Sequence, residues 1–274
     1  MTIPENNSIN NIERFSGFED VYDQHRPVAP SLVVDILSNY LQKKPGLVVD
    51  VGCGTGLSSF IWRDRADRII GVEPNLDMLN KARYKLSLTT QADHLSFEQG
   101  YSNQLSLDSN STDIVTCSQS FHWMEPVSTL KEIARVLVPG GIFATYDCDW
   151  PPTVNWQLER EYNNLLAISE RIIAEQADPH KVAHKSNKDN HLQQIEQSGY
   201  FRFTKEIVFH NIEACSAERY VGILLSQGGI QAALQLKSDY LESEINIFQA
   251  MADDYFRGGV TNAMFSYRMR LGIR

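Results

Sequence analysis

A glycine-rich turn is the part of the sequence best suited to bind a ligand. Gly52, Gly54 and Gly56 follow a short apolar run and precede an apolar pattern typical of a helix, and glycines in such a turn let backbone amides approach a ligand closely. The spacing is GxGxG, whereas the dinucleotide fingerprint GxGxxG would require a further glycine where Leu57 stands. The turn therefore favours a ligand other than a dinucleotide.

Two carboxylates beside this turn indicate the chemistry of the ligand. Asp50 stands two residues before the first glycine, where it would repel a diphosphate and attract an ammonium or sulfonium group. Glu73 ends the next predicted strand, 19 residues after Gly54, and a carboxylate there can accept hydrogen bonds from both hydroxyls of a ribose. Together they select a ribose-bearing ligand with a cationic amino-acid end. S-adenosylmethionine has both features.

Four motifs in order resemble the class I S-adenosylmethionine-dependent methyltransferases. They are VVDVGCGTG, IIGVEPNLDML, DIVTCSQSFHWME and LVPGG. The likeness covers roughly residues 15–147, and the tail FSYRMRLGIR is similar to the last strand of that fold. Within the class, the chain looks like the small-molecule branch that includes trans-aconitate methyltransferase-like enzymes and methyltransferase type 11 domains. Several ordered motifs at suitable spacing are more specific than one motif alone.

The resemblance implies a set of cofactor-binding residues along these motifs. Asp50 and the glycines would line the methionine end, Glu73 would hold the ribose, and Asn75 and Met78 would lie beside the adenine. The full set expected to bind the cofactor is Asp50, Gly52, Cys53, Gly54, Thr55, Gly56, Glu73, Pro74, Asn75, Met78, Tyr101, Ser102, Ser118 and Gln119.

One segment departs from the pattern of the family. Many relatives carry an acidic residue shortly after the third strand, where it accepts from the adenine amino group. Here that segment reads GYSNQL over 100–105, without an acidic residue. Tyr101, the side chain of Asn103 or the backbone alone would replace the acceptor.

Side chains that follow the fourth and fifth predicted strands are candidates for the acceptor side, since ligands of open α/β sheets lie at the carboxyl ends of the strands. Methyl transfer is an in-line displacement, so the protein must mainly align the reacting atoms. His122 is the candidate base because histidine titrates near neutral pH, or else it only shapes the cofactor wall. Trp123 is expected to form a wall, and Asp147 to pair with a cationic acceptor unless it is simply solvated.

The segment before the first predicted helix is similar to the one that folds over the cofactor as a lid in this family. In it, Tyr22 would face the methyl group as a catalytic residue and Arg26 would meet a carboxylate of the substrate. Ala29 replaces the second tyrosine of the family pattern, which loosens the likeness, and an aromatic-packed turn is the alternative. No metal site is predicted, because His180 and His184 have helical spacing but lack the glutamate of an HExxH motif.

Strands that alternate with helices must position these residues, and this rhythm indicates a parallel sheet with right-handed crossovers. The resemblance implies an α/β, Rossmann-like, doubly wound sheet of seven strands with an antiparallel last strand and a helical cap. Residues 1–14 are expected to be frayed. The predicted strands are 47–51, 68–72, 95–98, 113–117, 142–146, 201–209 and 263–273. The predicted helices include 28–41, 57–62, 75–86, 127–137, 153–185 and 216–256, the last broken at 228–229.

Three regions follow from these elements. Residues 1–40 would form an N-terminal lid and first helix, residues 41–150 the S-adenosylmethionine-binding core, and residues 151–274 a helical cap with the final two strands.

Composition narrows the possible partners of the 274-residue chain. Its net charge of −9 argues against nucleic acid and against an anionic membrane surface. The N-terminus lacks a signal-peptide pattern, no apolar stretch is long enough to span a membrane, and the four scattered cysteines suit reduced thiols, so a cytoplasmic protein is expected.

The sequence thus predicts an S-adenosylmethionine-dependent methyltransferase that acts on a small molecule held between the helical cap and the strand ends. One alternative is an NAD(P)-dependent oxidoreductase. Another is a non-catalytic module that binds S-adenosylmethionine and acts through a protein partner. The oligomeric state stays open.

Overall fold

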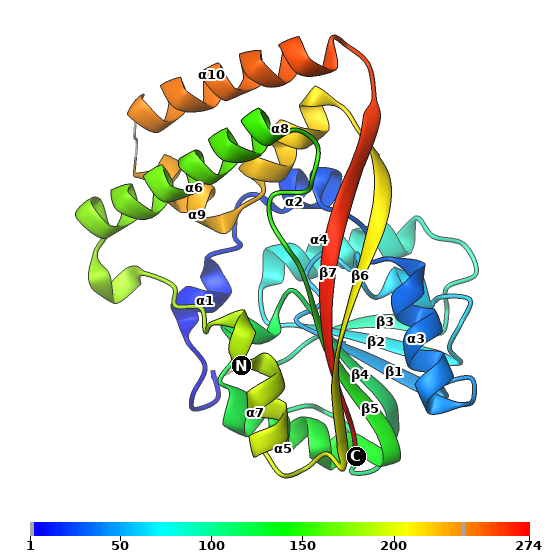
Figure 1. Cartoon of the computed structure of the whole chain (residues 1–274). Helices are drawn as coiled ribbons and strands as arrows, with labels where there is room; N and C mark the ends of the chain where they lie inside the picture. The colour runs from blue at the N-terminus through cyan, green and yellow to red at the C-terminus, as the bar shows by residue number, and fades with distance from the viewer. Residues whose placement is uncertain (1–2, 237–238) are drawn as a thin grey trace.

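Seven strands form one sheet in the order β3-β2-β1-β4-β5-β7-β6 in the computed structural model, which describes residues 3–236 and 239–274 (Figure 1). The first five strands are parallel, whereas β7 runs antiparallel to both of its neighbours. The predicted seven-stranded sheet with an antiparallel last strand is confirmed. The strands are β1 (Leu47–Val51), β2 (Arg68–Glu73), β3 (Leu95–Gln99), β4 (Thr112–Ser118), β5 (Leu137–Cys148), β6 (Phe203–Cys215) and β7 (Thr261–Ile273).

Helices cover both faces of the sheet, which explains why β1 is buried along its whole length. One hydrophobic cluster includes Val33 and Leu79 from one pair of helices, and a second cluster includes Ile133 and Ile195 from the other pair. The sheet-covering helices are α3 (Ser31–Leu41), α4 (Leu76–Ser87), α5 (Pro126–Val136) and α7 (His191–Gln197).

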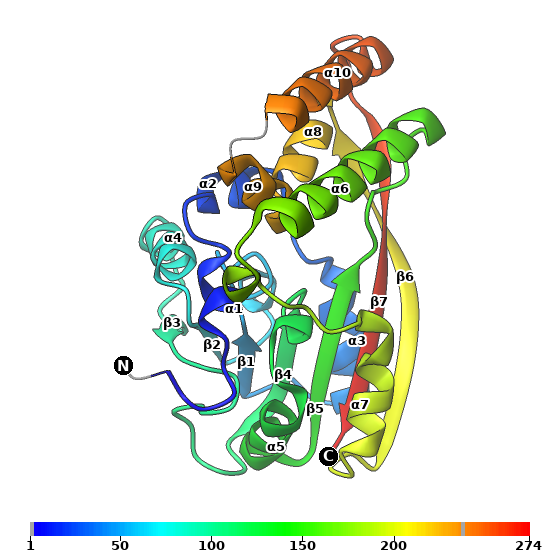
Figure 2. The same cartoon turned by 90° about the vertical axis from the view of Figure 1, so that its left-hand side faces the viewer.

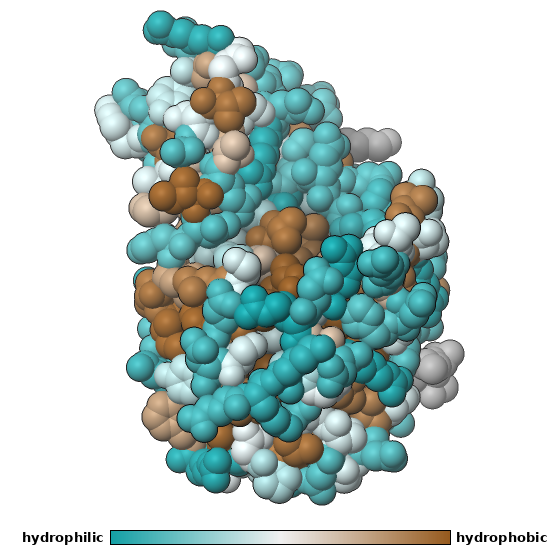
Figure 3. Space-filling view, turned by 90° about the vertical axis from the view of Figure 1, so that its right-hand side faces the viewer, coloured by the Kyte–Doolittle hydropathy of each residue, from teal (hydrophilic) through white to brown (hydrophobic). Residues whose placement is uncertain are grey.

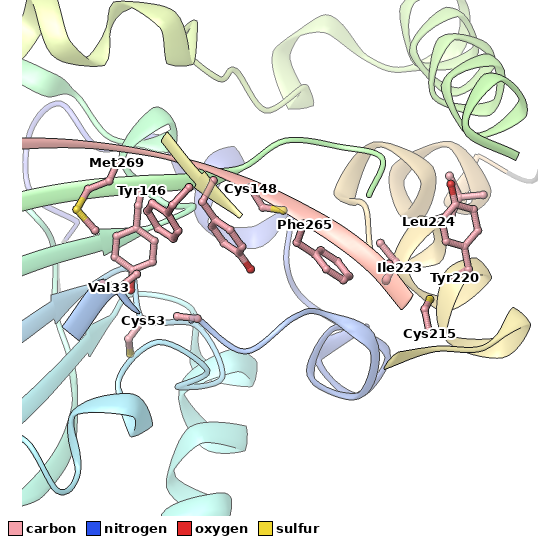
Figure 4. Packing of buried hydrophobic residues seen from close by; sticks show 14 of the residues in the cluster. Val33, Cys53, Tyr146, Cys148, Cys215, Tyr220, Ile223, Leu224, Phe265 and Met269 are labelled. Atoms are coloured by element: carbon pink, nitrogen blue, oxygen red, sulfur yellow. The ribbon is translucent and has the colours of Figure 1, made fainter. Parts of the chain in front are cut away.

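A helical cap stands at the end of the sheet where β1, β2 and β4 finish (Figures 1 and 2). Its helices are α2 (Glu19–His25), α6 (Trp156–Gln176), α8 (Ala217–Leu225), α9 (Gly228–Gln235) and α10 (Asp239–Phe256). The long strands β6 and β7 run from the sheet up to this cap. Met269 and Phe265 follow one another along β7, and Tyr220 and Leu224 lie at the cap end of the same cluster (Figure 4). Sheet and cap therefore share one hydrophobic core.

The surface of the molecule, unlike its core, carries both hydrophilic and hydrophobic side chains. Figure 3 shows one mostly hydrophilic face on which hydrophobic side chains surface in several separate patches. The four cysteines are buried free thiols. Within 3–236 and 239–274, no helix combines the length and the hydrophobicity needed to cross a bilayer.

Three expected helices differ from those observed, and the one expected over 216–256 is divided into α8, α9 and α10, with Gly228 as the first residue of α9 instead of a break. The chain after the glycine turn forms only a short 3-10 helix, η1 (Phe60–Trp62), where the sequence predicts a helix over 57–62. The Ser58 and Ser59 hydroxyls there donate to the buried carboxylate of Asp50 at 2.6 Å, which ties the segment leading into η1 to β1. The helix expected over 153–185 ends at Gln176, and Pro179 opens a 3-10 turn soon after it.

The N-terminal segment also differs, because the expectation that residues 1–14 are frayed is wrong for the part that the structure describes. Ile9–Glu13 forms the short helix α1, which lies between the cap helices and the sheet (Figure 2). Its polar side chains bond to distant parts of the chain, a stabilisation that no local pattern shows.

Candidate functional site

A cavity opens at the carboxyl ends of β1, β2 and β4, with α1 and α2 on its opposite side. Most of the predicted cofactor residues line it, namely Gly52, Cys53, Gly54, Glu73, Pro74, Met78, Tyr101, Ser102, Ser118 and Gln119. Three residues predicted for the acceptor side line it too, namely Tyr22, Arg26 and Trp123. The tertiary structure thus gathers these residues, which the chain spreads over more than a hundred positions.

The glycine turn is built to bring backbone close to this cavity. Gly52 has a φ of +68°, and a Cβ atom on it would lie 2.6 Å from Cβ of Ser120, so only glycine fits. Gly54 has a φ of +55°, and its Cβ position has no neighbour within 4 Å. The turn therefore adopts a conformation that favours glycine and leaves open space above Gly54 for a ligand.

Glu73 joins the turn to the end of β2. Its Oε2 accepts a hydrogen bond from the backbone N–H of Gly54 and its Oε1 accepts one from that of Asn75, both at 2.9 Å. Burial raises the pKa of Glu73 to about 7, although these two bonds oppose the shift. Each carboxylate oxygen keeps a free lone pair, so the group can still accept from two hydroxyls of a ligand.

Asp50 lies beneath the turn, and it does not line the cavity. Its Oδ2 accepts from the hydroxyls of Ser58 and Ser59 at 2.6 Å, and its Oδ1 accepts from that of Thr116 at 2.9 Å. Burial raises its pKa, while the three hydroxyls oppose that rise. Asp50 therefore links the segment after the turn to β4 and has no direct contact with the cavity, where the sequence predicts one.

Three other predicted cofactor residues lie next to the cavity instead of on its wall. Thr55 and Gly56 continue the turn away from it, and the Asn75 side chain caps α4 by accepting from the N–H of Met78 at 3.0 Å. The Asn75 amide also donates to the carbonyl of Ile12 at 2.9 Å. Asn75 thereby holds the N-terminal segment against the binding region.

That N-terminal segment supplies a wall of the cavity that sequence reasoning missed. Asn11 donates to the carbonyls of Trp123 and His184, each at 2.9 Å, and accepts from the His184 N–H at 2.8 Å. The missed cavity residues of this segment are Asn7, Ser8, Asn11, Ile12 and Phe15. The only signal in the sequence was a run of asparagines near an aromatic residue.

The structure also narrows the options for adenine recognition. The Asn103 side chain is engaged with the N-terminal segment, since it accepts from Asn7 at 2.9 Å and donates to the carbonyl of Glu5 at 2.9 Å. Tyr101 and Ser102 line the cavity instead. Of the two side chains that the sequence offered, Tyr101 is the one that lines the cavity.

Arg26 is fixed at the cap side of the cavity by neutral groups. Its Nε donates to the Ser226 hydroxyl at 2.7 Å, and its Nη2 donates to the Ser226 carbonyl and to Gln227, both at 3.0 Å. Its guanidinium also lies over the rings of Tyr22 and Trp150, 5.0 and 4.5 Å from their centroids. The positive charge is thus held rigidly at the wall.

His122 and Asp147 do not line this cavity and belong to a buried cluster behind it. Nδ1 of His122 lies 3.3 Å from one carboxylate oxygen of Asp147, and Nδ1 of His191 lies 3.4 Å from the other. Nζ of Lys188 lies 3.1 Å and Nη1 of Arg270 lies 3.6 Å from the same carboxylate. The Asp147 charge is already balanced here, so the predicted pairing with a cationic acceptor does not fit its position.

In this cluster His122 is neutral and Asp147 is ionised. Burial lowers the pKa of His122 to about 4, although Asp147 opposes the shift, so the imidazole is neutral at pH 7. Burial also raises the pKa of Asp147, but His122, His191 and Lys188 outweigh it and hold that pKa well below its usual range. These two histidines and Asp147 converge as metal ligands do, yet two cations already occupy the carboxylate.

The sequence of this chain is similar to those of known methyltransferases. Residues 49–145 match the family model described as a methyltransferase domain. An uncharacterized methyltransferase of Mycobacterium tuberculosis is 32% identical over 127 residues, which cover 46% of this chain and 49% of the relative. The chain spans about half the length of the curated relatives it matches.

Solved structures share the fold at low sequence identity. A protein of Anaeromyxobacter dehalogenans, described as a candidate type II methyltransferase, has a TM-score of 0.63 at 17% identity and covers 90% of this chain and 97% of its own. Phosphoethanolamine N-methyltransferase 2 of Haemonchus contortus, solved with S-adenosylhomocysteine, has a TM-score of 0.53 at 14% identity. That match covers 94% of this chain and 56% of the nematode protein.

Proposed function

We propose that this chain is a class I S-adenosylmethionine-dependent methyltransferase that transfers the methyl group of S-adenosylmethionine to a small-molecule acceptor, because residues 49–145 match the model of a methyltransferase domain. The observation that carries the proposal is the pairing of Gly54 with Glu73 at one wall of the cavity. This pairing leaves open space above the turn and presents a carboxylate that can accept from both hydroxyls of a ribose.

The residues of the cavity fit such a cofactor from end to end. Gly52 and Gly54 would hold the amino-acid end, Glu73 the ribose, and Met78 and Tyr101 the adenine, while α1 closes the opposite side. When bound, the cofactor supplies an electrophilic methyl group. The protein then has mainly to bind the acceptor in line and exclude water.

We assign the acceptor to the space between the strand ends and the cap, beside Tyr22, Arg26 and Trp123. Burial raises the pKa of Tyr22, so its hydroxyl stays neutral and can orient the nucleophile by a hydrogen bond. His122 is neutral and lies behind Trp123, with their ring centroids 4.9 Å apart. This position favours a wall role for His122 over proton transfer, and Asp147 would hold it there.

Substitution of Glu73 tests the proposal. We expect Glu73→Ala to weaken S-adenosylhomocysteine binding by about 1–3 kcal/mol in calorimetry, because the ribose hydroxyls lose their acceptor. Glu170→Ala removes an exposed carboxylate from α6 and should bind as the unchanged protein does. Equal affinity in the Glu73 and Glu170 variants would remove Glu73 from the cofactor site.

Two rival functions are separated by simple measurements. An NAD(P)-dependent oxidoreductase would be stabilised by NAD or NADP in thermal-shift experiments, whereas we expect stabilisation by S-adenosylhomocysteine alone. A non-catalytic module would bind the cofactor without turnover. We expect label to move from methyl-labelled cofactor to at least one compound of a metabolite panel, and the absence of any transfer would favour the module.

A further inference from the structure

Arg26 lines the acceptor side of the cavity, Arg14 packs on two aromatic rings that line it, and neither arginine has an acidic partner. Most buried or partly buried cations of this protein are paired, such as Lys85 with Asp23 and Arg270 with Glu206. Among the residues that the structure describes, Arg14 and Arg26 form an ion pair with no carboxylate. Both arginines are partly buried, and a partly desolvated charge without a counter-charge calls for an explanation.

Arg14 is held in place by aromatic packing. Its Cζ lies 3.7 Å from the centroid of the Trp123 ring and 5.3 Å from that of Phe15, and both rings line the cavity. Its Nε is buried with no hydrogen-bond partner. A Cβ atom on Gly228, the first residue of α9, would lie 2.3 Å from its Nη2, so the guanidinium packs closely against the start of this helix.

Arg26 reaches the residues directly before the same helix start. Its guanidinium donates to Ser226 and Gln227, the two residues directly before the glycine that Arg14 contacts. Burial, and next the charge of Arg26, lower the pKa of Arg14 to about 10, which leaves both groups cationic at pH 7. Two neighbouring like charges are thus held together by neutral and aromatic groups.

We propose that Arg14 and Arg26 form a two-guanidinium site that binds an anionic group of the methyl acceptor, either a carboxylate or a phosphate. The inference rests on the proposed function and adds a substrate class to it. A planar guanidinium donates paired hydrogen bonds to either anion, and the missing counter-charge is then supplied by the substrate itself. Phe15, Tyr22 and Trp123 would pack against the apolar part of the acceptor.

Small anions test the site without knowledge of the natural acceptor. The unfolding temperature of the protein saturated with S-adenosylhomocysteine is measured in malonate and in inorganic phosphate, with chloride at the same ionic strength as the baseline. We expect malonate, phosphate or both to raise it, and the anion that acts distinguishes a carboxylate from a phosphate site. No rise with either anion would overturn the proposal.

Substitutions of single arginines show which residues bind the anion. Arg14→Gln and Arg26→Gln should each weaken the anion's apparent affinity at least about tenfold, and Arg14→Lys, which keeps the charge, should retain part of it. Arg160→Gln is the matched control, since Arg160 is exposed and its Cζ lies over the Trp156 ring, 5.4 Å from the centroid. An equal response in all variants would place the anion elsewhere and overturn the proposal.

Measurements of turnover and of cofactor binding distinguish a failure of the anion site from a failure of the proposed methyltransferase function. S-adenosylhomocysteine affinity, measured by calorimetry, should stay within about twofold in both glutamine variants. If the cofactor does not bind the unchanged protein, the proposed function fails. If it binds and the acceptors found in a labelled panel are neutral or cationic, with KM unchanged in Arg26→Gln, only the anion site fails.

Discussion

At the scale of single residues, the cavity depends on groups held in unusual states. Glu73 is a carboxylate whose pKa is raised to about 7, and Gly52 is a glycine in the left-handed region with another side chain against it. Both states are consequences of packing the glycine turn against the ends of β2 and β4. Each makes a measurable prediction.

The pKa of Glu73 predicts how cofactor affinity depends on pH. Ribose hydroxyls donate to the ionised carboxylate, so binding favours the form that dominates above pH 7 and weakens as pH falls through that value. From pH 8 to pH 6, S-adenosylhomocysteine affinity should fall about tenfold, the change in the ionised fraction of a group with this pKa. In Glu73→Gln, calorimetry should give a weaker affinity that hardly changes with pH. A similar slope in both proteins would assign the effect to another group.

Two glycine-to-alanine substitutions separate the effect of a steric clash from the effect of a positive φ angle. Gly52→Ala places a Cβ atom 2.6 Å from that of Ser120, so we expect S-adenosylhomocysteine binding to weaken at least about tenfold as the turn shifts. Gly258 has a similar φ of +72° but no neighbour within 4 Å of its Cβ position. Gly258→Ala should therefore cost only about 1 kcal/mol of stability and leave cofactor affinity unchanged. Equal affinity losses would contradict the steric argument.

At the scale of elements, the helix α1 closes the cavity and is held there by hydrogen bonds, among them those of Asn11 and the bond from the Asn75 amide to the Ile12 carbonyl. Asn11 links α1 to the loop that contains Trp123 and to the segment around His184. None of the residues of α1 is buried, so the helix gains little from hydrophobic packing. Its docking must depend on these polar contacts.

Asn11→Ala should therefore loosen α1 while the rest of the fold stays intact. Loss of three hydrogen bonds should speed amide hydrogen exchange over residues 7–15 and weaken S-adenosylhomocysteine binding about three- to tenfold. The free energy of global unfolding should hardly change. Glu13→Ala, at an exposed position of the same helix, is the control and should change neither quantity. Unaltered exchange in the Asn11 variant would show that α1 is held by other contacts.

At the scale of the whole molecule, β7 joins the sheet to the cap. Phe265 is fully buried on this strand, between the sheet residue Met269 and the cap helix α8 (Figure 4). Since the two regions share one hydrophobic cluster, they should unfold together.

Phe265→Ala tests this coupling. Its cavity should cost about 3–5 kcal/mol of unfolding free energy, and the denaturation curve should keep a single transition by fluorescence and by circular dichroism. Val260→Ala, at a site 68% exposed just before the strand, should change stability by less than about 0.5 kcal/mol. A cap that melts separately from the sheet would show that the shared cluster does not couple them.

The sequence by itself determined the features that depend on near neighbours. The alternation of apolar runs defined the parallel strands. The spacing of Gly52, Gly54 and Glu73 indicated a turn suited to a ribose-bearing ligand, because the turn ends one strand and Glu73 ends the next strand along the chain. The antiparallel last strand came from resemblance to a family. These are properties of short segments or of their order.

Only the tertiary structure decided which distant side chains meet. It engaged Asp50 with the hydroxyl of Thr116, buried His122 against Asp147, and brought Arg14 to Gly228 at the edge of the cap. The physical reason is that burial and the balance of charge depend on everything packed around a group. A pattern of nearby residues carries no information about partners far away in the sequence. Thr116 lies more than sixty positions from Asp50, and Gly228 lies more than two hundred from Arg14.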